Sequence, residues 1–425
     1  MVKPFRMVVA TAVAALAAGA CQLIAGIDDR ADLRAPVDAL APNADAESAA
    51  AAADSAPPYV CGARWPAPPE LEDPEGDTGR IFDVVNWASL SLAADAGFPE
   101  AGGDAGKGYG YGWDLDCVTT CDGPESCFVH KGQTQPPRHC DQANGRDNET
   151  QELNSELRAL EPALAGFFDI GSSILGGKAS LLIEITGYNG GRNDKHVLLS
   201  VLAASGLITP DGGFPDDAGH PSFTPEESWY IDPRSVMDAS TTINTPLYSD
   251  INAYVNEGVV VASIARISLA FGYATGARAI FSFSDTTISG KLVKRGAGYA
   301  IEDGHIGGRI TTRDLLTALA SFSDPFDPAR HVCGDDATYA NAKVVICGGA
   351  DLSRDPVLGV SGRPCEALSA GIGFTAVPTF KGPLGSVDAG APFCVLVDGG
   401  PWTDDCDPDW PLADAADAAA RDAAK

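Results

Sequence analysis

Residues 259–293 read VVVASIARISLAFGYATGARAIFSFSDTTISGKLV. Runs of β-branched, aromatic and other apolar residues alternate here with small polar ones, and glycine separates the runs. This composition is typical of β-strands, so we predict strands at Val259–Ile264, Ile267–Tyr273, Arg278–Ser284 and Thr287–Val293. Four strands in so short a stretch indicate a body built mainly of β-structure.

A second strand-rich stretch lies upstream. Ser180–Thr186 and His196–Ala203 are strand-like and flank Gly187–Lys195, a polar loop rich in glycine and asparagine. This order predicts a hairpin with a long tip. Because binding residues concentrate on loops held by rigid scaffolds, the tip is a candidate ligand site, with ordinary turn chemistry as the alternative. Its candidate ligand-binding residues are Asn189, Asn193 and Asp194.

Two helices are expected beside the strands. Leucines at helical spacing predict a helix from Asp147 or Asn148 to about Phe168, which Pro162 kinks or splits. Acidic residues follow its first residue and suit the positive end of the helix dipole. A second, shorter helix is expected after Thr311 or Thr312, and a final strand at Gly373–Phe380.

These elements predict a mainly β fold with a few short helices, arranged as a β-sandwich or jelly-roll-like body over residues 149–410. Residues 61–148 are rich in cysteine, glycine and proline and predict a disulfide-rich, irregular N-terminal cap. Residues 21–60 are mostly Ala, Asp and Pro. Such a stretch cannot bury enough apolar surface to order itself, so we expect a flexible linker. Residues 411–425 have the same character and predict a disordered tail.

The first twenty residues have the pattern of an export signal. A basic start precedes the apolar run Met7–Ala20, which is shorter than a bilayer-spanning helix. The run ends in Ala18-Gly19-Ala20-Cys21, which resembles a bacterial lipobox. We therefore predict a lipoprotein signal peptide over 1–20, lipidation of Cys21, and attachment to the membrane through the N-terminal lipid. Ala18 replaces the usual leucine, so simple secretion with cleavage after Ala20 is the alternative.

The chain is strongly acidic. Its formal charge of −29 becomes −31 when residues 1–20 are removed, because they contain Lys3 and Arg6 and no acid. So negative a surface repels phosphate backbones and anionic headgroups. We expect no nucleic-acid partner, and we expect a glycan or an envelope component instead.

The cysteine count agrees with export. Of 11 cysteines, Cys21 is assigned to the lipid, which leaves an even number for disulfides. Their clustering suggests two bridges within 117–140 and local bridges within 333–347 and 394–406. Zinc held by the first cluster is less favoured, because the spacing is wider than that of zinc sites. The cysteines predicted to pair are Cys61, Cys117, Cys121, Cys127, Cys140, Cys333, Cys347, Cys365, Cys394 and Cys406.

Five short motifs lie along the chain: LIAGID at 23–28, DLDC at 114–117, CDQANGRDN at 140–148, NGGRND at 189–194 and GHIGGR at 304–309. With these motifs the chain resembles a group of surface lipoproteins from myxobacterial-type soil bacteria. The resemblance covers most of the mature chain. It implies a location in the cell envelope, at the outer membrane or cell surface, and a shared architecture. No activity is attached to the group, so no catalytic residue is carried over.

One acidic, loop-rich segment is a candidate calcium site. Ca²⁺ takes six to eight oxygen ligands and tolerates irregular geometry, which suits disulfide-held loops. The EF-hand pattern is absent, since Val118 stands where its fifth position needs an oxygen. The alternative is that these residues cap turns and a helix start. The candidate ligands are Asp114, Asp116, Asp141 and Asp147.

Signatures of catalysis are weak. The nearest match to a nucleophile elbow, 359–363, ends in Arg363 instead of glycine, and 171–178 is followed by Ala179 where a P-loop needs Ser or Thr. We therefore expect no catalytic residues and a non-catalytic ligand- or glycan-binding module. A secreted hydrolase using paired carboxylates and a structural envelope protein are the alternatives.

Overall fold

The structure is a computed structural model of the whole chain, and its described residues are 64–74, 82–89, 111–119, 127, 141, 145–160, 164, 170–208, 221–224, 226–237, 245–272, 278–296, 298–322, 332–334, 336–355, 364–385, 394 and 403–406. The chain divides into the units Met1–Pro58 and Tyr59–Lys425, and all described residues belong to the second. The predicted signal peptide, Cys21, the linker 21–60 and the tail 411–425 lie outside the described residues.

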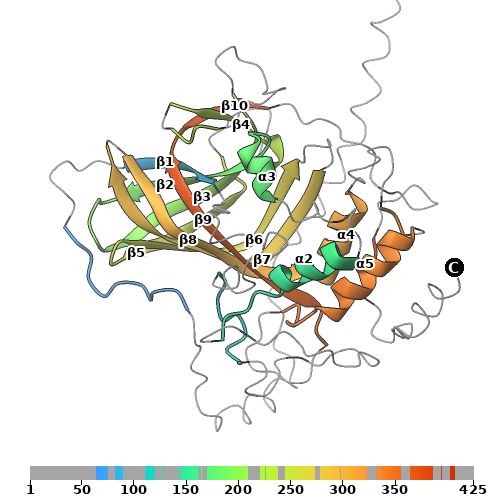
Figure 1. The fold of residues 1–425 in the computed structure, drawn as a ribbon. Coiled ribbons are helices and arrows are strands. Elements are labelled where there is room, and N and C mark those ends of the chain that lie inside the picture. The colour runs from blue at the N-terminus through green and yellow to red at the C-terminus, as the bar shows by residue number, and fades with distance from the viewer. Residues whose placement is uncertain are drawn as a thin grey trace, which may run out of the picture. The chain divides into compact units, whose positions relative to one another are not determined.

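Strands dominate the described part of the chain (Figure 1). The strands are Phe82–Ser89 (β1), Ser180–Tyr188 (β2), Asp194–Leu207 (β3), Ser228–Ile231 (β4), Tyr248–Asn256 (β5), Val259–Gly272 (β6), Arg278–Arg295 (β7), Gly298–Thr311 (β8), Ala367–Pro378 (β9) and Phe380–Leu384 (β10). The helices are Glu149–Leu160 (α2), Ile170–Leu175 (α3), Thr312–Ala320 (α4) and Ala337–Gly348 (α5), with a short 3₁₀ turn at Pro233–Ser235.

The ten described strands form one sheet in the order β10-β4-β3-β2-β1-β9-β8-β7-β6-β5. An additional antiparallel pairing joins β3 to β5, so the strands from β3 round to β5 make a closed circuit. Strand β3 makes this closure because its first half pairs with β5 and its last residues, Ala204–Leu207, pair with β4. The sheet therefore curls (Figure 1), and buried side chains of its strands and of the helices form one large apolar core.

The longer helices gather on one side of strands β7, β8 and β9 (Figure 1). Helix α4 begins where predicted, since the Thr311 hydroxyl accepts a hydrogen bond from the Asp314 amide as an N-cap. Its buried face, which includes Leu315, Leu316 and Leu319, packs into the core. Helix α3 contacts both β1 and β6, which are not neighbours in the sheet, so it spans the curl.

The predicted mainly β class with a few short helices is confirmed. The strands lie in one curled sheet and not in the two separate sheets of a sandwich. The cause is the length of β3: 14 residues give one edge room for two partners, and the closure with β5 replaces the second sheet. The first helix ends at Leu160, before Pro162, in agreement with the predicted break.

Two long elements, β8 and α5, were missed. Strand β8 contains Gly304, Gly307 and Gly308, and these glycines lower the β-strand propensity of its sequence. Gly304 and Gly307 are needed because large side chains lie against the strand: a Cβ on Gly304 would come within 2.6 Å of Phe374, and one on Gly307 within 2.3 Å of Trp113. Helix α5 carries no strong apolar period, and its start is fixed by the Asp336 carboxylate, which accepts from the Thr338 amide.

The stretch 61–148 is irregular in most of its described parts, as predicted for a cap, but it also supplies a strand of the main sheet. Strand β1 lies between β2 and β9 and pairs antiparallel with both. The stretch is therefore tied into the body through backbone hydrogen bonds as well as through a disulfide, Cys127–Cys365.

Three disulfide bonds join described cysteines, and they correct the predicted pairings. Cys127 pairs with Cys365 across a sequence separation of 238, so it does not belong to a bridge within 117–140. The predicted local bridges 333–347 and 394–406 are also wrong: the pairs are crossed, with Cys333–Cys394 and Cys347–Cys406. Cysteine spacing could not reveal this, because the sheet and helices bring distant segments together. Cys117 is also disulfide-bonded, whereas Cys61, Cys121 and Cys140 lie outside the described residues.

Peptide mapping without reduction tests this crossed pattern. We expect linked peptides that contain Cys333 with Cys394 and Cys347 with Cys406. Replacing Cys347 and Cys406 by serine should lower the free energy of unfolding by about 2–4 kcal/mol, because the closed loop is long. A linked peptide joining Cys333 to Cys347 would contradict the pattern.

Candidate metal site

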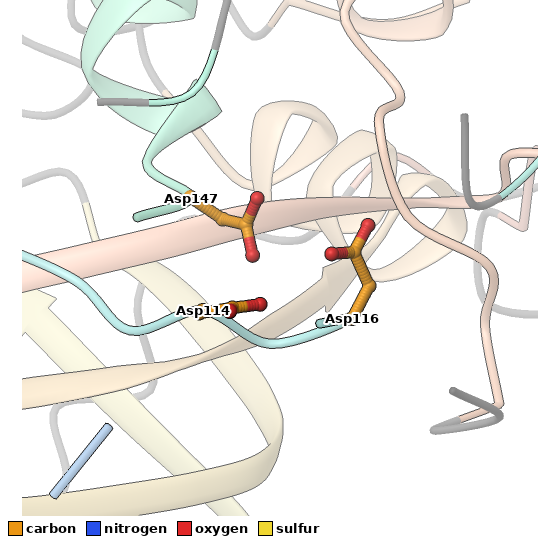
Figure 2. Close-up of side chains that lie close together, drawn as sticks. All are labelled: Asp114, Asp116 and Asp147. Atoms are coloured by element: carbon orange, nitrogen blue, oxygen red, sulfur yellow. The ribbon is translucent and has the colours of Figure 1, made fainter. Parts of the chain in front are cut away.

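Three acidic side chains from two segments of the chain converge beside the sheet (Figure 2). Asp114 and Asp116 lie on the segment 111–119, and Asp147 lies two residues before α2. An isolated antiparallel bridge joins Trp113 to Asp147, whose amide donates to the Trp113 carbonyl at 3.1 Å. The bridge holds the two segments side by side and so places the carboxylates together.

The three carboxylates are enclosed and close to one another. Each offers an oxygen atom within 4.8 Å of the others, and the residues are only 2–3% exposed. Backbone amides fix their orientation: Asp114 accepts from Cys117 at 2.6 Å, Asp116 from Val118 at 2.9 Å, and Asp147 from Leu115 at 2.7 Å. The orientation of these carboxylates is therefore set by the local backbone, so the group can hold a metal ion.

Two glycines make this convergence sterically feasible. Gly112 has a φ of +125°, and a Cβ there would lie 2.4 Å from the Asp147 carbonyl oxygen. Gly145 has a φ of +69° and lies against the Asp114 carboxylate. Because L side chains rarely adopt such φ values, both positions require glycine.

Burial and the repulsion of neighbouring acids raise the pKa of two carboxyls in this region, Asp147 and Asp351. The pKa of Asp147 is well above its usual value because of burial, and then because of the negative charges of Asp116, Asp141 and Asp351. The Leu115 amide opposes this rise. The pKa of Asp351 is also raised well above its usual value, by burial and by Glu149. The site therefore favours a positive partner, which is either a proton or a cation.

Arg309 of β8 supplies one buried positive charge. It is 2% exposed, and its guanidinium donates to the Leu115 carbonyl at 2.7 Å and to the Ser353 carbonyl at 3.1 Å. Its Nε lies 3.5 Å from the carboxylate of Asp285. Burial lowers the pKa of Arg309, whereas Asp285 and the acids of the site raise it. Arg309 thus ties the segment of Asp114 and Asp116 to the sheet.

A second polar contact connects the site to α2 and β9. The Ser369 hydroxyl, which is fully buried, donates to the Asp351 carboxylate at 2.6 Å and accepts from the Glu149 amide at 2.8 Å. The Ser369 amide also donates to Asp351, at 2.8 Å. The start of α2 is thereby fixed to strand β9 next to Asp147.

The structure brings together three of the four predicted calcium ligands. Asp141 lies outside the group of three, although its charge contributes to the raised pKa of Asp147. Sequence reasoning missed Asp351, Ser369 and Arg309, because they come from distant parts of the chain. Arg309 ends the motif GHIGGR, which was noticed only as part of a resemblance.

Aromatic rings cover the segment that carries the site. The Trp113 ring lies 5.8 Å from that of Trp65, edge to face, and 5.3 Å from that of His305, which also contacts Tyr111. Burial lowers the pKa of His305, with a further contribution from Arg146. His305 is therefore held in its neutral form within an apolar stack.

The predicted ligand-binding residues of the hairpin tip make hydrogen bonds within the protein. The Asn189 side chain donates to the Asp73 and Asn193 carbonyls and accepts from the Gly191 amide. Asp194 accepts from the amides of Asn189 and His196, and the Asn193 side-chain oxygen accepts from Glu257. These bonds organise the tip and dock the segment around Asp73 on it, so they agree with turn chemistry. Ligand binding here stays a prediction.

Comparisons with protein families, with curated proteins and with solved structures find no match to this chain. Across the residues that the structure describes, no helix has both the length and the apolar character needed to cross a membrane. The chemistry of the site therefore has to be argued from its own geometry.

Removal of the buried guanidinium should be costly. Arg309→Met leaves the Leu115 and Ser353 carbonyls and the neighbouring acids without their positive partner, so we expect the free energy of unfolding in urea to fall by about 3–5 kcal/mol. Arg295→Met is the matched control, since its ion pair with Glu302 is largely exposed, and it should cost about 0–1 kcal/mol. Equal losses in the two variants would contradict the role of Arg309.

Proposed function

We propose that this chain is an exported, lipid-anchored protein of the cell surface whose β-rich body is a non-catalytic ligand-binding module. The observation that supports export is the set of three disulfides between cysteines from distant segments. Such bonds persist in oxidising compartments and are rare in the reducing cytosol. The apolar N-terminal run that ends at Cys21 supports the lipid anchor, and the acidic surface favours a glycan or envelope partner over a nucleic acid.

We further propose that Asp114, Asp116 and Asp147 bind calcium. Two oxygens bound to one Ca²⁺ at 2.3–2.6 Å lie no more than about 5 Å apart, and the oxygens of this group meet that limit at 4.8 Å. Hard carboxylate oxygens without nitrogen or sulfur donors suit calcium. The raised pKa of Asp147 indicates that negative charge is in excess at this place.

The enclosure of the site favours a structural ion over a catalytic one. Hydrolysis by paired carboxylates requires that substrate reaches both groups, whereas these three residues are 2–3% exposed. Trp113 and Trp229 are also buried, at 7% and 0% exposure, so neither ring is available to stack on a sugar. An ion here would fasten the segment 111–119 to the start of α2. It would therefore stabilise the packing of these two segments against each other.

A calcium titration of thermal unfolding tests this site. We expect the melting temperature to rise with Ca²⁺, by the equivalent of about 2.7 kcal/mol at a concentration 100 times Kd. The double variant Asp116→Asn, Asp147→Asn keeps an oxygen that can accept from the Val118 and Leu115 amides. Because it removes like charges, we expect it to be at least as stable as the parent without calcium and to show no rise with calcium.

Asp303→Asn is the control for this titration. Asp303 is an exposed acid at a position with φ of +48°, which asparagine also tolerates. This variant should keep the full calcium response. A parent protein that does not respond to calcium, or a double variant that responds as the parent does, would exclude calcium at this site.

The lipid anchor has its own test. Cys21→Ala removes the proposed lipidated sulfur, so the variant should move from the detergent phase to the aqueous phase of a Triton X-114 separation, because no acyl chains are left to partition. A secreted protein cleaved after Ala20 would instead be aqueous in both forms. Unchanged partitioning of the variant into detergent would rule out the anchor.

A further inference from the structure

Residues 64–74, which we call the strap, precede β1 and have the sequence RWPAPPELEDP. None of them belongs to a helix or a strand. Prolines recur along the strap, and proline lacks the amide hydrogen that pairing in a sheet requires and favours the polyproline II conformation. The strap is therefore held on the body by the groups that the body offers to it.

The end of β5 holds the first half of the strap. The Tyr254 hydroxyl donates to the Pro66 carbonyl at 2.6 Å, and the Asn256 side chain donates to the Ala67 carbonyl at 2.7 Å. Burial raises the pKa of Tyr254 to about 12, so this hydroxyl keeps its proton and remains a donor. An aromatic side chain that contacts a proline-rich segment is typical of sites that recognise such peptides.

The hairpin tip holds the other end of the strap through Asp73. The Asn193 amide donates to the Asp73 carboxylate at 2.9 Å, and the Asp73 amide donates to the Asn193 carbonyl at 3.0 Å. The Asn189 side chain donates to the Asp73 carbonyl at 3.3 Å. The pKa of Asp73 is below its usual value, chiefly because of the Asn193 amide, and the charge of Arg192 adds to this effect. The tip therefore stabilises a carboxylate.

Gly191 makes room for this carboxylate. A Cβ at this position would lie 2.8 Å from both the Cβ and a carboxylate oxygen of Asp73. Real Cβ atoms essentially never come so close, so the absence of a side chain at Gly191 is what allows the strap to reach the tip.

The strap fits this surface incompletely. Pro69 is buried, but Leu71 is 80% exposed, and Glu70 and Glu72 on either side of it are exposed as well. Hydrogen bonds between partly exposed groups contribute little each, and segments held in this way open locally while the rest of the fold stays intact. The strap thus has the features of a weakly held ligand that is tethered to its own site.

We propose that Tyr254, Asn256, Asn189, Gly191 and Asn193 form a docking surface for an extended, proline-rich segment of a partner polypeptide that carries a carboxylate, and that the strap occupies this surface in cis. A second copy of the chain is disfavoured as the partner, because copies of charge −29 repel one another. This inference rests on the proposed ligand-binding function, for which it names a site and a ligand class, and it requires neither the lipid nor calcium.

A fluorescein-labelled peptide with the strap sequence, RWPAPPELEDP, is the probe that tests this surface by fluorescence anisotropy with the full chain. In the parent protein the tethered strap competes at a high effective concentration. Asp73→Lys removes the carboxylate of the strap and repels Arg192, so it should free the docking surface. We expect this variant to bind the probe at least about tenfold more tightly than the parent does.

Glu70→Lys is the matched control, because it makes the same change of charge at an exposed residue of the same strap. It should bind the probe as weakly as the parent does. Adding Gly191→Ala to Asp73→Lys places a Cβ where the carboxylate of the probe must lie, so the gain in affinity should be lost. A probe in which lysine replaces its aspartate should also fail to bind Asp73→Lys.

The proposal is overturned if Asp73→Lys does not bind the probe, or if the parent binds it as tightly as this variant does. A parent that forms dimers by exchanging straps would identify a second copy as the occupant and would overturn it too. If Asp73→Lys does not fold, Asp73→Ala decides the question, since it removes only the carboxylate. Failure of the probe would remove this site alone, whereas detergent partitioning and calcium titration test the other parts of the proposed function.

Discussion

The pairing of β3 with both β5 and β4 along one edge is the constraint on which the architecture depends. The first half of β3 closes the sheet through β5, and the last residues extend it through β4. Closure gives hydrogen-bond partners to backbone N–H and C=O groups that would otherwise be unpaired beside a core without water. It also draws β5 away from β6, with which β5 pairs only over Tyr254–Asn256.

The second constraint is electrostatic. Segment 111–119, the start of α2 and the residues after α5 all bring acids to one buried place, and Arg309 is the guanidinium that reaches it from the sheet. Buried charges are tolerated only when they are paired, hydrogen-bonded or neutralised. The amides of Leu115, Cys117 and Val118 provide part of this compensation. The remaining excess of negative charge is the physical reason to expect a cation.

The sequence predicted the parts of this protein that depend on local order. The strand character of residues 180–203 and 259–293, the start of α4 at Thr311 and the break before Pro162 all follow from short-range patterns. The four strands predicted over 259–293 are in fact two long ones, β6 and β7. Strand β8 could not be predicted in this way. Its glycines are required by contacts with Trp113 and Phe374, which come from other parts of the chain. The disulfides were misassigned for the same reason: proximity in sequence does not give proximity in space.

The sequence by itself determined the β-rich class, the even number of cysteines left for pairing, the strong negative charge and three of the carboxylates of the candidate site. These properties depend on composition and on spacing within one segment. Only the tertiary structure decided that the sheet is single and closed, that Asp351 and Arg309 join the acids, and that β5 leaves β6 to pair with β3. Each of these depends on contacts between residues far apart in the chain, which are set by packing and backbone pairing across the whole fold.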